Sequence, residues 1–226
     1  MIKSFVVIGI LLSSSLMAQE PVERKVEPFD NLVVGDKIIV RLVKSDHVSA
    51  SIRVQGIDAG AVKTINENGN LVISVYGEPF TKKKVTITLH YVSLRSITVT
   101  GGAEVTTEGI FKTDSLYVDL KSGGMLYLDA DIGYLSGKIT EGALLNAEGY
   151  ADEQNMVVST SGTLSAFALE SDKVTIKATT GGKAKIYAED ELNAEAASKG
   201  FISYKGDPTK FNPVTNSGGT IVVYTP

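Results

Sequence analysis

Three aspartates are the side chains best suited to acid–base chemistry. Asp119 and Asp129 fall on predicted strands of one repeat unit, and Asp131 falls at its predicted corner. A glycosidase needs two carboxylates that flank the scissile bond, and a lyase needs a Lys or Arg base beside carboxylates that hold calcium. Solvated outward-facing positions explain the three carboxylates without any chemistry. We therefore expect no catalytic residues and no enzyme.

The only histidines are His47 and His90, and the chain has no cysteine. A zinc site or a Ser-His-Asp triad built on these histidines needs partners that the spacing does not indicate. The calcium-binding nonapeptide is also missing, because the residues after each Gly-Gly step are apolar. We expect no metal, no cofactor and no disulfide.

Four aromatic residues at outward-facing strand positions are the predicted ligand-binding residues. Phe167, Tyr187 and Tyr224 stand five places after a repeated glycine, and Tyr127 stands three places after another. We expect stacked coils to align Phe167 with Tyr187. Exposed aromatic rings in a row can stack on sugars or anchor a protein partner. The alternative is a ladder that only stabilises adjacent strands.

These side chains must be carried by a repeating backbone unit. A Ser/Thr-Gly or Gly-Gly step recurs at intervals of 22, 18, 20, 20, 18 and 19 residues, ending at Gly102, Gly124, Gly142, Gly162, Gly182, Gly200 and Gly219. Such regular spacing is typical of repeat proteins. It predicts an all-β fold, a parallel β-helix (solenoid) with coils of about 20 residues. A β-sandwich, which also has short alternating strands and glycine turns, is the alternative.

Apolar residues alternate on both sides of each glycine, which predicts strands with one buried face. After the glycine, the predicted inward positions are Leu126, Leu144, Leu164, Ala184, Ile202 and Ile221, followed two places later by residues such as Leu128 and Asn146. Before the glycine they include Leu116, Val118 and Leu120. The unit at Gly142 fits only when shifted by one residue, through Leu135 and Ile139, so we expect a β-bulge or an extra turn residue there.

Residues 1–18 have the layout of an export signal, with Lys3, an apolar run at 5–12 and small residues up to Ala18. The run is too short to span a bilayer, so we expect removal after Ala18. We expect a poorly ordered leader at 19–26, a less regular N-terminal β-region or cap at 27–95, and β-solenoid repeats at 96–226. Within the cap, the turn residues at 66–70 predict a hairpin between strands at 62–65 and 71–76.

The net charge changes sign near residue 95. Residues 19–95 carry 11 Lys and Arg against 9 Asp and Glu, a balance of +2, and residues 96–226 carry 10 against 17, a balance of −7, with no Arg or His. An acidic surface without arginine suits an exported protein and not a nucleic-acid partner. We expect a glycan or protein partner in the envelope or outside the cell. The expected location is the periplasm, the outer cell surface or the medium.

An ordered set of motifs over residues 27–224 resembles the GIN-domain family. The set comprises Glu27-Pro28-Phe29-Asp30-Asn31-Leu32, the turn and strand at 68–73, the strand at 94–97 before Thr100-Gly101-Gly102, and the repeated Ser-Gly steps. The sequence departs from the usual glycine pattern at Glu141-Gly142 and Lys199-Gly200. The resemblance implies a β-helical head domain of an autotransporter adhesin on a bacterial envelope, and it supplies no catalytic residues.

Taken together, the sequence predicts an exported, non-enzymatic, adhesin-like or cell-envelope interaction module. Its ligand would be a carbohydrate or a protein. Parallel β-helices also carry polysaccharide lyases and glycosidases, so a carbohydrate-active enzyme is the alternative.

Overall fold

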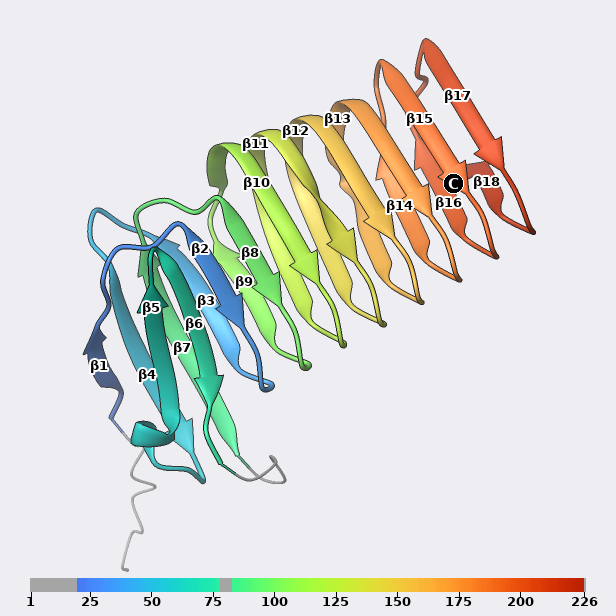
Figure 1. Ribbon diagram of the computed structural model, residues 1–226. Coiled ribbons are helices and arrows are strands. Elements are labelled where there is room, and N and C mark those ends of the chain that lie inside the picture. Colours follow the sequence, from blue (N-terminus) through green and yellow to red (C-terminus); the bar gives the residue numbers. More distant parts are fainter. Residues whose placement is uncertain (1–19, 78–82, 226) are drawn as a thin grey trace, which may run out of the picture.

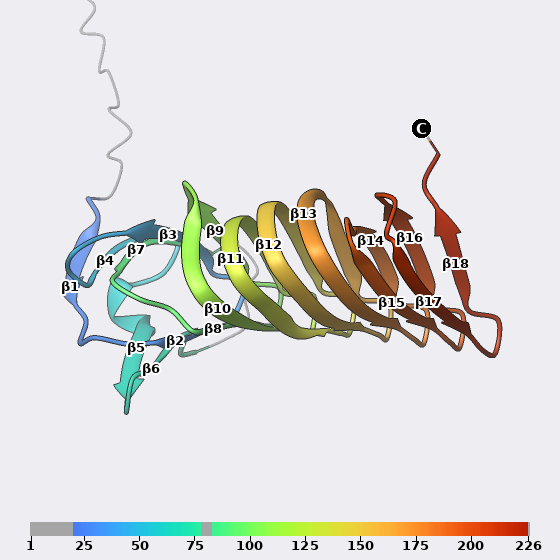
Figure 2. The same cartoon turned by 90° about the horizontal axis from the view of Figure 1, so that it is seen from above.

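The strands of this protein wind into a two-sided β-solenoid (Figure 1). A computed structural model describes residues 20–77 and 83–225. The predicted export signal at 1–18 lies outside the described residues. The long strands β11 (Met125–Ile139), β12 (Leu144–Val158) and β13 (Thr163–Ala178) bend from one side of the solenoid to the other (Figure 2). Within the described ranges the only helix is the 3-10 turn η1 (Ala59–Ala61). The predicted all-β solenoid is confirmed.

Two sheets face each other across the core. Sheet 1 contains, in spatial order, β5 (Val62–Glu67), β6 (Asn70–Val75), β2 (Asn31–Val34), β8 (Ser96–Val99), β10 (Phe111–Leu120), the second halves of β11 to β13, β15 (Glu191–Ala196) and β17 (Lys210–Thr215). Sheet 2 contains β1 (Val22–Lys25), β4 (Ser49–Gln55), β7 (Lys84–Tyr91), β3 (Ile39–Lys44), β9 (Glu104–Glu108), the first halves of β11 to β13, β14 (Lys183–Tyr187), β16 (Phe201–Lys205) and β18 (Thr220–Val223).

The repeat half is a stack of parallel coils around one apolar core. Partners in the register are 18 to 21 residues apart. One ladder comprises Leu126, Leu145, Leu164, Ala184, Ile202 and Ile221. All of these except the terminal Ile221 are fully buried. Each coil therefore places one apolar side chain directly above that of the previous coil, which explains the strict alternation in the sequence.

The predicted inward positions of Leu144 and Asn146 are wrong. Leu145 and Ala147 are buried in their place, while Asn146 is exposed. The reason lies in the turn, where Ala143 occupies the position that Gly124 and Gly162 hold in neighbouring coils, so that Gly142 is one residue earlier than the pattern assumed. The bulge expected before Gly142 is also absent, because β10 and β11 stay in register from Leu116–Leu135 to Leu120–Ile139.

The repeated Ser-Gly phrase combines two different backbone requirements. In the turn before β11, Ser122 and Gly123 both have positive φ, 50° and 73°. The glycine after such a turn allows close stacking instead, since a Cβ on Gly219 would lie 2.0 Å from the carbonyl oxygen of Ala196 in the previous coil. The residues with positive φ reverse the chain, and the glycine that follows them allows neighbouring coils to stack closely.

The N-terminal end closes the solenoid with antiparallel strands. Parallel pairs join β2 to both β6 and β8, and β3 to both β7 and β9, so the coil formed by β2 and β3 lies between two coils that follow it in the chain. Strands β4 and β1 then extend sheet 2, and β5 extends sheet 1, all by antiparallel pairing. The hairpin predicted at 62–76 is confirmed as β5 and β6.

The leader expected to be poorly ordered at 19–26 contains strand β1. Its residues pair with β4 from Val22–Ile52 to Lys25–Ser49. The guanidinium of Arg24 donates to the carbonyl oxygens of Val62 at 2.7 Å and Ala59 at 3.2 Å. Backbone pairing and these charge-assisted bonds hold the segment, and the expectation of disorder is wrong.

Candidate functional site

The aromatic residues predicted to bind a ligand all lie on sheet 2, but in two places. The ring centroids of Phe167 and Tyr224 are 4.8 Å apart and tilted by 53°, and the ammonium of Lys205 lies 4.8 Å and 5.2 Å from them. Lys185 lies 5.8 Å from the Phe167 ring. Lysines therefore cover part of the aromatic surface near the C-terminal end.

Phe167 and Tyr187 directly follow Ala166 and Ile186, the last paired residues of the neighbouring strands β13 and β14. Phe167 is the additional residue of a β-bulge, because Asn146 pairs with Ser165 while Glu148 pairs with Ala168. The Tyr187 hydroxyl donates to Glu189 Oε2 at 2.9 Å, and this hydrogen bond raises the pKa of the tyrosine. The bulge breaks the regular ladder at this point.

The three aspartates considered for catalysis lie on two neighbouring strands, Asp119 on β10 and both Asp129 and Asp131 on β11. Asp119 is ion-paired with Lys121 at 3.4 Å, and Asp131 with Lys112 at 2.6 Å. Asp119 lies in register with Lys138, whereas Asp129 lies in register with Glu148. No group of three or more His, Cys, Asp or Glu in the described part of the chain is arranged to hold a metal ion.

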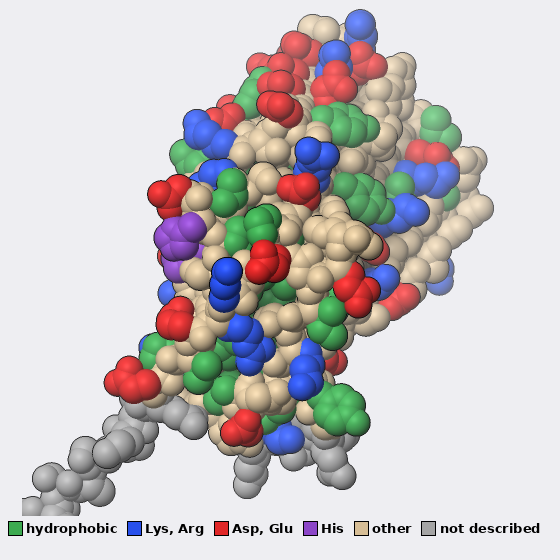
Figure 3. Space-filling view, turned by 60° about the vertical axis from the view of Figure 1, so that its left-hand side comes forward, with side chains coloured by type: hydrophobic (Ala, Val, Ile, Leu, Met, Phe, Trp, Pro, Cys, Tyr) green, Lys and Arg blue, Asp and Glu red, His purple; other side chains and the backbone are tan. Residues whose placement is uncertain are grey.

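The two histidines, far apart in the sequence, stack on each other at the surface. Antiparallel pairing of β4 with β7 places the rings 6.0 Å apart, with 15° between their planes. In Figure 3 the histidine side chains form one purple patch. Ser49 Oγ lies 3.2 Å from His90 Nδ1, and Asp46 Oδ1 lies 2.7 Å from His47 Nδ1. The hydrogen bond to His47 lowers the pKa of Asp46.

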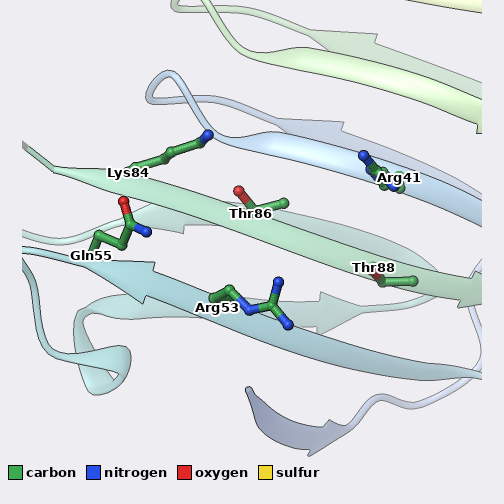
Figure 4. A pocket seen from close by; sticks show the side chains of 6 residues that line it. All are labelled: Arg41, Arg53, Gln55, Lys84, Thr86 and Thr88. Atoms are coloured by element: carbon green, nitrogen blue, oxygen red, sulfur yellow. The ribbon is translucent and has the colours of Figure 1, made fainter. Parts of the chain in front are cut away.

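A basic groove lies on the outer face of sheet 2. It has a volume of about 330 Å³ and is lined by Arg41, Arg53, Gln55, Lys84, Thr86 and Thr88 (Figure 4). We call these six residues the basic groove. Register places Arg41 beside Thr88, Arg53 beside Thr86, and Gln55 beside Lys84, on the adjacent strands β3, β7 and β4.

The strand pleat explains why these side chains converge. Their neighbours in sequence, such as Val40, Leu42, Ile52 and Ile87, are buried in the core, so every second residue of β3, β4 and β7 must face solvent. Glu108 Oε1 lies 3.3 Å from Arg41 Nη1 and partly neutralises one cation. The groove therefore combines guanidinium, ammonium, amide and hydroxyl groups on three rigid strands, a donor set suited to carboxylate, sulfate or phosphate groups.

The predicted residue Tyr127 belongs to the same outward row as the groove. Register links Thr88, Arg41, Thr106, Tyr127 and Asn146 in consecutive strands. With strands about 4.8 Å apart, Arg41 and Tyr127 are separated by roughly 10 Å along the row. A second hollow of about 170 Å³ surrounds Tyr127 and is lined by Thr106, Thr107, Leu128, Asp129, Asn146 and Glu148.

Sequence reasoning missed the basic groove. Its cations are at positions 41, 53 and 84, and only the inserted coil of β6 and β7 brings them together. A signal was present, because all four arginines of the chain precede residue 96 and Arg41, Arg53 and Lys84 all occupy the outward phase of their strands.

Comparisons with known proteins bear on the whole fold. The crystal structure of a "putative adhesin" (BF0245) from Bacteroides fragilis NCTC 9343 is similar, with a TM-score of 0.78 and 21% identity over 90% of this chain and 96% of that one. A "putative lipid binding protein" from Parabacteroides distasonis ATCC 8503 has a TM-score of 0.72 and 18% identity over 91% and 96% of the two chains. A "putative adhesin" from Parabacteroides merdae ATCC 43184 has a TM-score of 0.72 and 19% identity over 91% and 95%.

These likenesses, at about one identical residue in five, establish the shared fold. No curated protein sequence matched the chain. No helix in the described residues is long and apolar enough to cross a membrane. The family model described as "putative auto-transporter adhesin, head GIN domain" matches residues 28–208, which is most of the chain. The protein therefore belongs to the family of auto-transporter adhesin head GIN domains.

Proposed function

We propose that this protein is an exported, non-enzymatic adhesion module that binds an acidic carbohydrate on sheet 2. The observation that carries the proposal is the basic groove, where Arg41, Arg53 and Lys84 face one hollow of about 330 Å³. Family membership supports an adhesin-like role, and the layout of residues 1–18 supports export.

The chemistry of the groove favours an anionic sugar over a neutral one. Arginine presents a planar fork that binds a carboxylate through two parallel bonds, and each charge-assisted hydrogen bond contributes about 1.5–3 kcal/mol. Thr86 and Thr88 add hydroxyl groups within the same hollow. Tyr127 adds a ring two strands away, on which a second sugar of an extended chain would stack.

The rigidity of the strands that carry the basic groove favours ligand binding over catalysis. The strands that carry the groove are each paired on both sides, so their side chains need little reorganisation to meet a ligand. Asp119 and Asp131 are each ion-paired with a lysine, Lys121 and Lys112, which supports a non-enzymatic role, since a glycosidase needs two carboxyl groups that are free to act on one bond.

The proposal is tested by binding measurements with polygalacturonate and with a heparin oligosaccharide, using neutral dextran as the reference. We expect both acidic polymers to bind and dextran not to bind. Binding should weaken steeply between about 0.01 M and 1 M salt, as the Debye length falls from about 30 Å to about 3 Å. Equal binding of dextran and the acidic polymers would contradict the proposal.

Substitution of the arginines locates the site. Arg41→Gln with Arg53→Gln should raise the Kd about 10- to 100-fold, equivalent to about 1.4–2.8 kcal/mol. Arg95→Gln is the matched control, because Arg95 is an exposed arginine of the same N-terminal region outside the groove. A loss of binding in the control of the same size would point to net charge instead of the groove.

A second contact surface is proposed at Phe167, Tyr187 and Tyr224, because Tyr224 is 43% exposed and packs against Phe167. Phe167→Ala with Tyr187→Ala should weaken ligand binding and leave the melting temperature nearly unchanged. A ladder with only a structural role would lose about 0.2–1 kcal/mol of stability per pair and keep its binding. Glycan cleavage that disappears in Asp129→Asn would favour the enzyme alternative over both surfaces.

A further inference from the structure

The C-terminal end of the solenoid leaves its core open. In the last coil, Phe211 is 39% exposed and Val223 57% exposed, although both lie in register with buried or half-buried positions of the previous coil. Val214, Val222 and Tyr224 add exposed apolar surface at the same end. Figure 2 shows β17 and β18 as the last strands of the stack among the described residues.

The two edge strands at this end differ in their free backbone groups. Lys210 and Asn216 of the β17 region donate their N–H groups to Asp190 and Ala196 of the previous coil, so the alternate residues Phe211, Pro213 and Thr215 point theirs outward. Pro213 has no N–H, which removes the middle donor and protects this edge from pairing.

Strand β18 has no such protection. Thr220 and Tyr224 donate to Gly200 and Tyr204 at 2.9 Å and 2.7 Å, so the N–H and C=O groups of Ile221 and Val223 face the open side. The strand Thr220-Ile221-Val222-Val223 contains no charge and no proline.

We propose that β18 pairs with β18 of a second copy of this chain, antiparallel and about a two-fold axis through Val222. That register places Ile221 opposite Val223 of the partner copy, and both present outward-facing N–H and C=O groups, as a hydrogen-bonded antiparallel pair requires. The side chains of Ile221 and Val223 continue the core ladders, so pairing joins the two cores. Val222 then lies opposite Val222 in a non-hydrogen-bonded pair.

Charge favours a second copy as the occupant. Residues 96–226 carry a balance of −7, so two copies repel each other over most of their surface. Residues 208–226 contain one charged side chain, Lys210, which is already paired with Glu191 at 3.6 Å. This end is therefore a surface on which two acidic solenoids meet without opposing carboxylates.

The size of the end face determines how strongly the two copies are expected to associate. Strands of 4 to 6 residues and sheets about 10 Å apart give a face of roughly 130–200 Å² per copy. Two such faces bury less than the roughly 1,200 Å² typical of stable complexes, so the dimer should be reversible. It would hold two basic grooves at opposite ends of one particle.

Sedimentation of the full chain between about 1 µM and 1 mM should show a monomer–dimer equilibrium. Val223→Pro removes only an outward-facing N–H, as Pro213 does in β17, and Val223→Lys adds a charge; each should raise the dimer Kd at least tenfold. Val214→Lys, at the same end but on β17, is the control and should have a smaller effect. A chain that stays monomeric at every concentration overturns the proposal, whether the pairing is weak or another segment or partner covers β18. Unchanged dimerisation of both Val223 variants overturns it as well.

A single cysteine tests the register, because the chain has none of its own. Non-hydrogen-bonded antiparallel partners have Cα atoms about 4.5 Å apart, within the range of a disulfide. Val222→Cys should therefore form a covalent dimer on mild oxidation. Asn146→Cys, an exposed position in an interior coil of the same sheet, should not. Equal crosslinking of the two variants would contradict the proposed pairing.

Discussion

The two ends of the solenoid face the same physical problem and differ in how they solve it. A stack of parallel coils leaves unpaired backbone groups and an uncovered core at each end. At the N-terminal end, the antiparallel strands β1, β4 and β5 cover the coil formed by β6 and β7. The edge strands β1 and β5 carry charged residues such as Glu23, Arg24 and Lys63. At the C-terminal end, β17 and β18 are the outermost described strands, and Pro213 protects only one of these two edges.

The two ends differ because each coil of a repeat protein is stabilised by contacts with its neighbouring coils. An interior or capped coil has neighbours on both sides, whereas the last coil has one. The same substitution should therefore cost much less at the open end than elsewhere.

Core truncation should show the contrast most strongly. Ile97→Ala removes a fully buried side chain of β8 and should cost about 2–5 kcal/mol of unfolding free energy. Val223→Ala, at a position 57% exposed, should change it by less than about 0.5 kcal/mol. Denaturant unfolding of dilute monomer measures both values, and equal losses would mean that the last coil is covered.

Adding a methyl group at the close-approach glycines should give a smaller contrast. A Cβ on Gly162 would lie 2.3 Å from the carbonyl oxygen of Ile139, and one on Gly219 would lie 2.0 Å from that of Ala196. Gly162→Ala should cost about 1–3 kcal/mol because the clash lies inside the stack. Gly219→Ala should only release the last coil, seen as faster hydrogen exchange in β17 and β18 with little change in global stability. A global loss as large as that of Gly162→Ala would show that the last coil unfolds together with the rest.

A buried polar pair provides a reference point in the middle of the stack. Gln154 Nε2 donates to Ser171 Oγ at 2.6 Å, while Gln154 Oε1 is buried without a hydrogen-bond partner among the described residues. Ser171→Ala should cost about 1–2 kcal/mol, since it leaves the amide donor unpaired as well. Gln154→Leu combined with Ser171→Ala should be neutral or stabilising, because the double variant leaves neither group unpaired and Leu135 and Val174 hold the same row as Gln154 in neighbouring coils. Strong destabilisation by the double variant would show that the pair has a role in register.

Alkaline titration should reveal the smallest effect, at the capped end. Burial raises the pKa of Tyr91 from 10.0 to about 12. The folded state therefore holds this proton more tightly than the unfolded chain does, so the associated stability is present below pH 10 and is lost as the pH rises from about 10 to about 12. In Tyr91→Phe the unfolding free energy should fall less steeply over that range. An unchanged slope would show that Tyr91 is solvated.

Much of the repeat half could be predicted from residues alone. Alternation around Leu164, Ile176 and Ile186 placed them inside, and they are fully or almost fully buried. The misplacement of Leu144 came from treating Gly142 as the stacking glycine when it is the turn glycine. Both roles select glycine, one through positive φ and the other through close carbonyl contact, so residue type by itself could not separate them.

The candidate site was the part least accessible to sequence. The alternation of Arg41, Arg53 and Lys84 with apolar residues fixes only that each faces solvent on its own strand. Their meeting in one groove depends on the insertion of β6 and β7 between the coil of β2 and β3 and strands β4 and β5. That strand order depends on pairing between residues that are distant in the chain, and a local sequence pattern does not reveal such pairing.

The sequence by itself determined the class of fold, the length of the coil, the buried face of each strand and the acidity of the repeat half, because each follows from the period and type of neighbouring residues. Only the tertiary structure decided which strands are neighbours. It thereby determined the basic groove, the stacked histidines and the open edge of β18. These features depend on contacts between residues that are distant in the chain, and such contacts are selected by the packing of the whole core.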